Sequence, residues 1–204
     1  MADLFDDPSR RLSLLNQDGL VDYWPHFMSE IAAQRWFDQL LRDVAWQTET
    51  YQIYGKDVTA PRRVAWYGDA DAVYTYSGIR HQPLPWTPGL MELKTQIERA
   101  CQTSFNSVLL NLYRDGQDSM GWHADAEPEL GINPVIASLS LGEVRSFKLR
   151  HNRTGQTLDI PLGTGSLLLM HGALQHHWKH SVAKSKRVLQ ARINLTFRKI
   201  VSGG

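Results

Sequence analysis

Cysteine is almost absent from the sequence, which has a single one, Cys101, in 204 residues. One thiol excludes an internal disulfide and a cysteine-rich zinc site, and is typical of a reducing compartment. No run approaches the ~18 apolar residues of a membrane span. The first residues carry acids and no apolar stretch, so they do not read as a secretory signal. We expect a soluble, intracellular protein with no membrane contact, and a monomer by default.

The sequence also lacks an excess of charge of one sign, with 22 Lys and Arg against 21 Asp and Glu. A formal net charge of +1 excludes a histone-like binder that relies on global charge, although a local basic face is compatible with it. What the chain does have is 42% hydrophobic residues, including 7 Trp, 7 Tyr and 6 Phe. So much aromatic area needs burial, which excludes intrinsic disorder and indicates a folded core.

Two amphipathic helices are predicted in the first half of the chain. One runs from Ser29, a plausible N-cap, to about Trp46, and the other from about Pro88 to Cys101. Both have apolar residues on one stripe and should pack as an outer layer. The polar stretch Met1–Asp22 is expected to be irregular, and the aromatic, turn-rich stretch Tyr51–Ser77 to form one or two hairpins that project from the body.

Short strand-like segments broken by turns dominate the chain after Ser104. They are Ser107–Tyr113, Val135–Leu141, Ser146–His151, Gly165–Met170, Trp178–Val182 and Val188–Arg198. Many short strands preceded by helices favour an α+β fold with a jelly-roll core and helices packed outside. We expect an N-terminal extension over residues 1–28 and a single domain over residues 29–204, with the jelly roll at residues 104–200.

A His-x-Asp pair, His123 and Asp125, lies among these segments. In an extended chain, residues two apart point to the same side, so the imidazole and the carboxylate can converge. With one more histidine they would complete a facial 2-His-1-carboxylate triad, a ligand set that suits Fe(II). Taken alone, the spacing is equally compatible with a hydrogen-bonded surface pair.

The last predicted strand alternates polar and apolar residues. Arg192, Asn194, Thr196 and Arg198 share one face, opposite Ile193, Leu195 and Phe197. Asn111 and Tyr113 also share a face in an earlier strand. These polar faces either meet water, as in many antiparallel sheets, or line a cavity suited to a small dianion.

Taken together, four motifs resemble the AlkB family of Fe(II)/2-oxoglutarate dioxygenases. They are Asn111-Leu112-Tyr113, His123-Ala124-Asp125, His180-Ser181 and Arg192-Ile193-Asn194-Leu195-Thr196-Phe197-Arg198. The resemblance covers roughly Asp57 to Ile200 and is nearest to the nuclear DNA-repair branch. It implies a double-stranded β-helix for the jelly roll and nucleotide-recognition hairpins for residues 51–77.

The resemblance implies His123, Asp125 and His180 as the iron ligands. His177 is the alternative third ligand, whereas His171 and His176 have no counterpart in the family motif. For 2-oxoglutarate, the resemblance implies two sets of contacts. Arg198, helped by Tyr113, would pair with the far carboxylate, and Asn111 and Arg192 would lie near the metal-bound end. Thr196 would add a hydroxyl or only fill space.

The implied activity is oxidative demethylation of N1-methyladenine and N3-methylcytosine in DNA, and conceivably in RNA, with Fe(II), 2-oxoglutarate and O2 and release of formaldehyde. Such a protein would act at the nucleoid of a bacterium or in the nucleus of a eukaryote. Two other functions stay open: the same chemistry on a protein or small molecule, and nucleic-acid binding by a degenerate site.

Substrate contacts are implied less specifically. Glu127 would face the cationic base, or simply form a solvated turn. The segment Tyr74–Ser77, through Tyr74, Tyr76 and Ser77, resembles the family segment that stacks on a flipped base. Ile53 and Tyr54 match a hairpin tip that wedges into DNA, or pack onto the core. Two basic clusters, Arg62-Arg63 and Lys184–Arg187, could meet phosphates or remain solvated surface charge.

Overall fold

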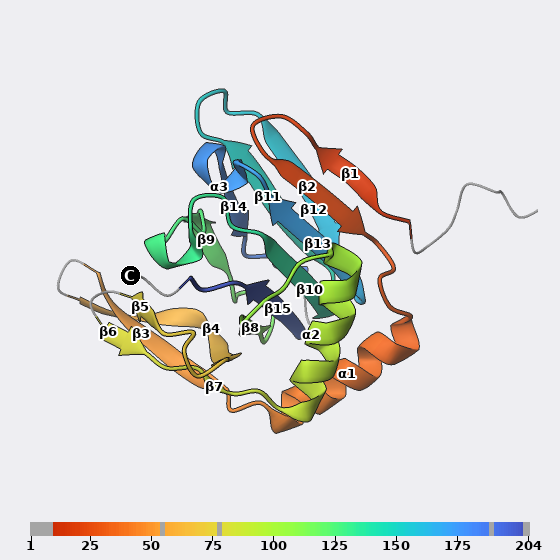
Figure 1. Ribbon diagram of the computed structural model, residues 1–204, viewed down its shortest axis with the longest axis vertical. Helices are drawn as coiled ribbons and strands as arrows, with labels where there is room; N and C mark the ends of the chain where they lie inside the picture. The colour runs from red at the N-terminus through yellow and green to blue at the C-terminus, as the bar shows by residue number, and fades with distance from the viewer. Residues whose placement is uncertain (1–9, 54–55, 77–78, 188–189, 202–204) are drawn as a thin grey trace, which may run out of the picture.

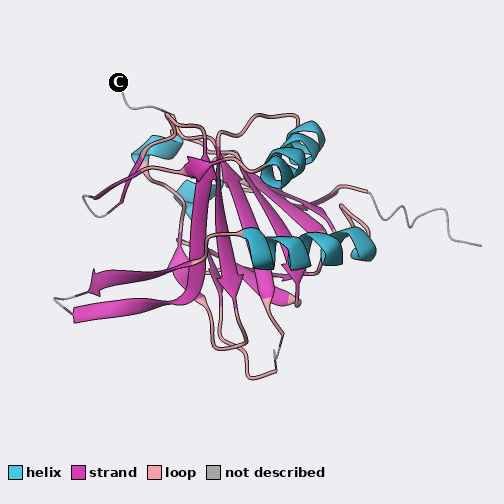
Figure 2. Ribbon diagram, turned by 90° about the horizontal axis from the view of Figure 1, so that it is seen from below, coloured by secondary structure: helices cyan, strands magenta, loops and turns pink. Residues whose placement is uncertain are grey.

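The computed structural model describes residues 10–53, 56–76, 79–187 and 190–201. Two sheets, antiparallel except for one short parallel pair in the larger, face each other, and two long helices lie on the outer side of the larger one (Figures 1 and 2). This arrangement is the predicted α+β jelly roll with helices outside. In the described residues, no helix is both long and apolar enough to cross a bilayer.

The larger sheet has nine strands and the smaller one four. The larger sheet runs β1 (Leu12–Leu15), β2 (Leu20–Trp24), β13 (Ser166–His171), β10 (Ile136–Gly142), β15 (Arg192–Arg198), β8 (Ser107–Tyr113), β4 (Lys56–Gly68) and β3 (Gln47–Ile53), with β7 (Leu84–Pro85) beside β4. The smaller sheet runs β12 (Thr157–Leu162), β11 (Arg145–His151), β14 (Trp178–Val182) and β9 (Met120–His123). A separate hairpin joins β5 (Tyr74–Tyr76) to β6 (Ile79–His81).

The two long helices begin where the sequence predicts, and each has an N-cap side chain, Ser29 as predicted and Thr87 in addition. In α1 (Glu30–Asp43), the Ser29 hydroxyl accepts a hydrogen bond from the Ala32 amide. In α2 (Pro88–Cys101), the Thr87 hydroxyl accepts one from the Leu90 amide. These bonds satisfy amides that have no partner within the helix, which is why both helices start where the sequence predicts.

Apolar side chains fill the interior on both sides of the larger sheet. Ile193, Leu195 and Phe197 of β15 are fully buried under the helices. A second apolar cluster, which includes Phe147 and Trp178, fills part of the space between the sheets. The rest of that space is lined by polar residues and forms the site described below.

The described part of the N-terminal stretch, from residue 10, is not irregular, contrary to the sequence-based expectation for Met1–Asp22. β1 and β2 form a hairpin that extends the larger sheet, because β2 pairs with β13. Val21 and Tyr23 are buried in the cluster between the sheets. Each strand is only four or five residues long, which is too short for a clear alternating pattern.

The Tyr51–Ser77 region also differs in part from the expectation. β3 and β4 do form a hairpin, but β4 continues into the larger sheet and pairs with β8. Val64, Ala65 and Tyr67 are buried there, so this segment is a core layer. The sequence pattern also missed β9, a short strand, and β12, an edge strand that tolerates Pro161.

We expect Ile97→Ala to lower the free energy of unfolding by about 2–5 kcal/mol, because it opens a cavity under α2 where Ile97 is fully buried. Ile31→Ala is the matched control, since Ile31 in α1 is 86% exposed, and should change stability by less than about 0.5 kcal/mol. Urea unfolding followed by circular dichroism measures both. Equal effects would contradict the packing of α2 described here.

Candidate active site

A cavity of about 740 Å³ opens between the two sheets. Its larger-sheet wall carries the polar faces of β8 and β15 that the sequence singled out. They contribute Asn111, Tyr113, Arg192, Asn194, Thr196 and Arg198. Arg192 is 1% exposed, so the alternative of a water-facing strand is wrong.

His123, Asp125 and His180 meet on the smaller-sheet side of this cavity. β9 and β14 are antiparallel neighbours, and their register places His123 directly opposite His180. Asp125 follows His123 by two residues and turns its carboxylate to the same side, with Oδ1 3.8 Å from His123 Nε2 and Oδ2 4.0 Å from His180 Nε2. One ligand atom from each residue lies within 4.8 Å of the others, a spacing that could hold a metal ion.

The protonation of the two imidazoles suits metal binding. His123 Nδ1 lies 2.9 Å from the Gly121 carbonyl oxygen, which can only accept, so in the neutral ring Nδ1 carries the proton and Nε2 has the lone pair. Burial lowers the pKa of His180 to about 3, which leaves this ring neutral near pH 7. The Phe147 ring stacks on His180 at a centroid distance of 5.2 Å and limits its rotation.

Asp125 is an ionised carboxylate inside the protein. Burial by itself would raise its pKa, but the charge of Arg198 and the hydrogen bond from it outweigh burial and lower the pKa to about 2. Arg198 Nη2 donates to Oδ2 over 2.9 Å. On the backbone, Gln175 Oε1 accepts a hydrogen bond from the Asp125 amide over 2.9 Å, a contact that no sequence motif indicated.

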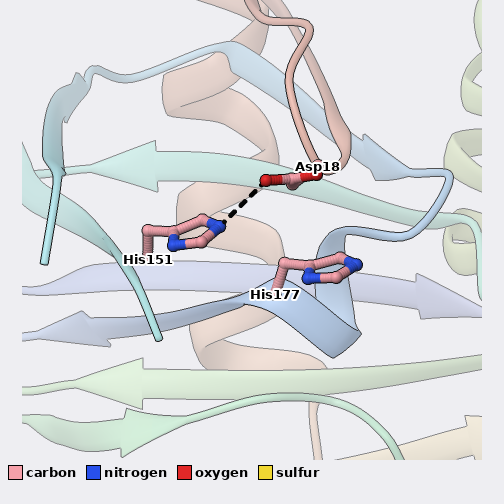
Figure 3. Close-up of side chains that lie close together, drawn as sticks. All are labelled: Asp18, His151 and His177. Atoms are coloured by element: carbon pink, nitrogen blue, oxygen red, sulfur yellow. Dashed lines mark hydrogen bonds and ion pairs between the residues drawn. The ribbon is translucent and has the colours of Figure 1, made fainter. Parts of the chain in front are cut away.

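A second cluster of potential ligands lies elsewhere: Asp18, His151 and His177 (Figure 3). Its chemistry differs, because His151 Nδ1 accepts hydrogen bonds from the amides of Arg153 and Thr154. The proton of neutral His151 is therefore on Nε2, which lies 3.1 Å from Asp18 Oδ2 and donates to it. This cluster anchors the β1–β2 turn to β11 and has no imidazole lone pair from His151 for a metal.

The other three histidines near His180 in the sequence have partners of their own. His177 stacks on His151 at a centroid distance of 6.1 Å, so the alternative third ligand is wrong. His171 Nε2 bonds to Asp22 over 2.8 Å, and His176 Nε2 donates to the Ile132 carbonyl over 2.6 Å. In the described residues, His180 alone joins His123 and Asp125.

The two arginines of the last strand sit at opposite ends of the cavity, and this reverses the pairing expected from the sequence. Register places Arg192 opposite Tyr113 and Arg198 opposite Ser107, six residues or about 20 Å further along the strand. The Arg192 guanidinium lies 5.2 Å from the centre of the Tyr113 ring, whereas Arg198 bonds to Asp125. Tyr113 therefore partners Arg192, not Arg198.

Arg192 offers unused hydrogen-bond donors at this end of the cavity. Nη2 donates to Ser140 Oγ over 2.9 Å, but Nε and Nη1 are buried without a hydrogen-bond partner among the described residues. Burial lowers the pKa of Arg192 to about 10, so the group stays charged near pH 7. A buried cation with free donors is a receptor for a carboxylate.

Other polar residues of the cavity wall make hydrogen bonds to one another. The Thr196 hydroxyl donates to Asn194 Oδ1, and Asn194 Nδ2 donates to Ser138 Oγ. Arg62, expected as a surface phosphate contact, is only 7% exposed, and its Nε donates to Asn111 Oδ1 over 2.8 Å. Its neighbour on the strand, Arg63, is exposed, which follows from the alternation of β4.

Glu127 is half-buried and lines the cavity, as does Glu49 from β3, which the sequence analysis did not single out. Of the predicted base and DNA contacts, Tyr54 and Ser77 lie outside the described residues. Ile53, Tyr74 and Tyr76 belong to β3 and β5, but their side chains are also outside what is described. Those roles remain predictions.

Comparison with known proteins agrees with this geometry. The family model of the 2OG-Fe(II) oxygenase superfamily matches residues 21–198. The alpha-ketoglutarate-dependent dioxygenase alkB homolog 3 of Bos taurus is 45% identical over 186 residues, which cover 86% of this chain and 64% of that protein. DNA oxidative demethylase ALKBH2 of Homo sapiens is 37% identical over 198 residues, which cover 92% of this chain and 76% of that protein.

The chain thus spans just under two thirds of the length of the bovine relative. The solved structure of OsALKBH1 superposes with a TM-score of 0.66 at 17% identity and covers 93% of this chain and 100% of that one, which shows a shared fold. The sequence similarity over most of the chain and the His-Asp-His cluster lead to the same assignment. The chain belongs to the AlkB family of the 2OG-Fe(II) oxygenase superfamily.

Proposed function

We propose that this protein is an Fe(II)- and 2-oxoglutarate-dependent demethylase of N-alkylated bases, N1-methyladenine and N3-methylcytosine, in DNA, with RNA as a further substrate to be tested. One observation carries the proposal. Two imidazoles and an ionised carboxylate converge on one wall of a cavity whose far end holds the buried Arg192 with free donors. The relatives named above as a dioxygenase and a DNA oxidative demethylase support the same activity.

In this proposal, His123, Asp125 and His180 hold Fe(II). Two nitrogen donors and one oxygen donor on one side of the ion form the ligand set that suits non-haem iron and leaves positions open for other ligands. Bound with 2-oxoglutarate and O2, the iron supplies the oxidation of an N-methyl carbon, which is then lost as formaldehyde. The chain supplies position and charge: Arg198 keeps Asp125 ionised, and Phe147 restricts the His180 ring.

Arg192 is the residue that we propose for the distal carboxylate of 2-oxoglutarate. Its Nε and Nη1 donors make no hydrogen bond within the described chain, Nη2 donates to Ser140, and the Tyr113 ring lies against the guanidinium. Asn111 also lines the cavity, and Arg198 lies beside the proposed metal ligand Asp125. We propose that the co-substrate lies along β15, with its distal carboxylate on Arg192 and its other end toward the metal ligands.

The cavity mouth is suited to a cationic base. Glu127 lines it from the segment that follows the metal motif, and a carboxylate there favours N1-methyladenine and N3-methylcytosine over neutral bases. A base within a duplex must be flipped out to reach this depth. We propose Tyr74, Tyr76 and Ser77 to stack on the flipped base and the Ile53-Tyr54 tip to fill the gap that it leaves.

Exposed cations near the site would meet phosphates. Arg63 and Arg150 are exposed, and so are the three basic residues of the loop Lys184–Arg187.

We further propose a monomer that acts in the nucleus of a eukaryote or at the nucleoid of a bacterium. The division into an extension, residues 1–28, and one dioxygenase domain, residues 29–204, also stays a prediction.

The activity is tested with oligonucleotides that carry N1-methyladenine in single-stranded DNA, duplex DNA and RNA. With Fe(II), 2-oxoglutarate and O2, we expect about one formaldehyde and one succinate per repaired base. Asp125→Ala should reduce turnover at least 100-fold, because it removes the only anionic ligand of the described cluster. The absence of turnover on every methylated nucleic acid would defeat the proposal. Succinate formation that ignores nucleic acid would favour a protein or small-molecule substrate.

Removing the buried guanidinium tests the co-substrate pocket. Arg192→Met should raise the KM for 2-oxoglutarate about 10- to 100-fold, since a charge-assisted hydrogen bond contributes about 1.5–3 kcal/mol. Arg99→Met, on the exposed side of α2, is the control and should leave this KM unchanged. An unchanged KM in a folded Arg192→Met protein would remove Arg192 from the pocket.

Neutralising the carboxylate at the mouth tests lesion choice. Glu127→Gln should raise the KM for N1-methyladenine several-fold and change the KM for a neutral methylated base less, because only the cationic base loses a charge interaction. Glu129→Gln, which does not line the cavity, is the neighbouring control. If the KM rises equally for cationic and neutral bases, Glu127 does not distinguish bases by their charge.

A further inference from the structure

The short helix α3 (Leu174–His177) lies against the segment that carries Asp125. Gln175 is 3% exposed, and its Oε1 accepts the hydrogen bond from the Asp125 amide over 2.9 Å. Because a backbone N–H can only donate, this bond fixes which end of the Gln175 amide faces Asp125. The other end, Nε2, is buried and has no hydrogen-bond partner in the described part of the chain.

Asp125 needs such a partner because it lies just beyond a strand. β9 ends at His123, so the amide of Asp125 is not part of the sheet ladder. An unpaired buried amide would cost about 1–3 kcal/mol. Gln175 satisfies this donor from outside the sheet and thereby fixes the backbone from which the carboxylate projects.

The same helix holds the far end of this segment. His176 Nε2 donates to the Ile132 carbonyl over 2.6 Å. Between the two attachment points lie Glu127 and the short 3-10 turn Pro128–Leu130. Two adjacent side chains of α3 therefore bracket residues 125–132, which contribute one metal ligand and one carboxylate at the cavity mouth.

From these contacts we infer that Gln175 is a positioning residue for the metal centre, acting through the backbone of Asp125. The inference rests on the proposed role of Asp125 as a metal ligand. Arg198 Nη2 donates a hydrogen bond to Asp125 Oδ2 over 2.9 Å. Without Gln175, that ion pair would draw the carboxylate away from His123 and His180, and the three ligand atoms would no longer be held for one ion.

Titration of the purified apo-protein with Co(II), under conditions free of 2-oxoglutarate and nucleic acid, tests this inference. Gln175→Met keeps the length of the side chain but removes the acceptor, and Gln175→Asn keeps the amide but is one methylene shorter. Both should raise the Co(II) dissociation constant about tenfold and alter the Co(II) visible absorption bands. Gln175→Glu retains an oxygen acceptor and should bind within about threefold of the unchanged protein.

Gln96→Met, at an exposed position of α2, is the matched control and should bind Co(II) normally. Circular dichroism of the apo-proteins identifies the variants that fold. Wild-type affinity and spectrum in either folded variant, Met or Asn, would overturn the role of Gln175. If Asp125→Ala also binds Co(II) with wild-type affinity, the metal-centre assignment itself fails. Loss of binding in Asp125→Ala, with unchanged binding in the Gln175 variants, refutes the role of Gln175 alone.

Discussion

The antiparallel pairing of β9 with β14 is the interaction on which the site depends. It places His123 and His180 side by side although 57 positions separate them in the sequence. The strand period of two then brings Asp125 to the same side as His123. Every other part of the site is arranged around this pair: Phe147 restricts one imidazole, Gly121 orients the other, and Gln175 supports the carboxylate.

The two buried charges of the described site, Asp125 and Arg192, each lie beside a partner. Asp125 is paired with Arg198, and Arg192 lies against Tyr113 and Ser140. An isolated buried ion would strongly destabilise the folded state. The unpaired donors of Arg192 therefore lower the stability of the fold but leave a site for a ligand. Arg145 illustrates the contrasting, structural use of a buried guanidinium, since it bonds to the carbonyls of Asp115, Asp118 and Ala183 and ties two loops together.

The tautomers of two histidines separate a metal centre from a structural cluster of nearly the same composition. Gly121 accepts from His123 Nδ1 and leaves Nε2 free, whereas two amides donate to His151 Nδ1 and place the proton on Nε2. The two clusters, His123-Asp125-His180 and Asp18-His151-His177, have the same residue types at similar distances. The backbone groups that contact each imidazole ring distinguish them.

Local sequence was sufficient for the starts of α1 and α2, for the Ser29 cap and for the alternation of β15, because these depend on neighbouring residues alone. The His-x-Asp pair and the spaced arginines likewise indicated the chemistry. The family motif pointed to His180 as the third ligand, and the structure brings that residue to His123 and Asp125. Tertiary structure alone decided which arginine faces Tyr113 and that Arg62 is buried. The physical reason is that strand pairing and register join residues far apart in the chain, and a residue's partners across a sheet leave no mark on its own neighbours in sequence.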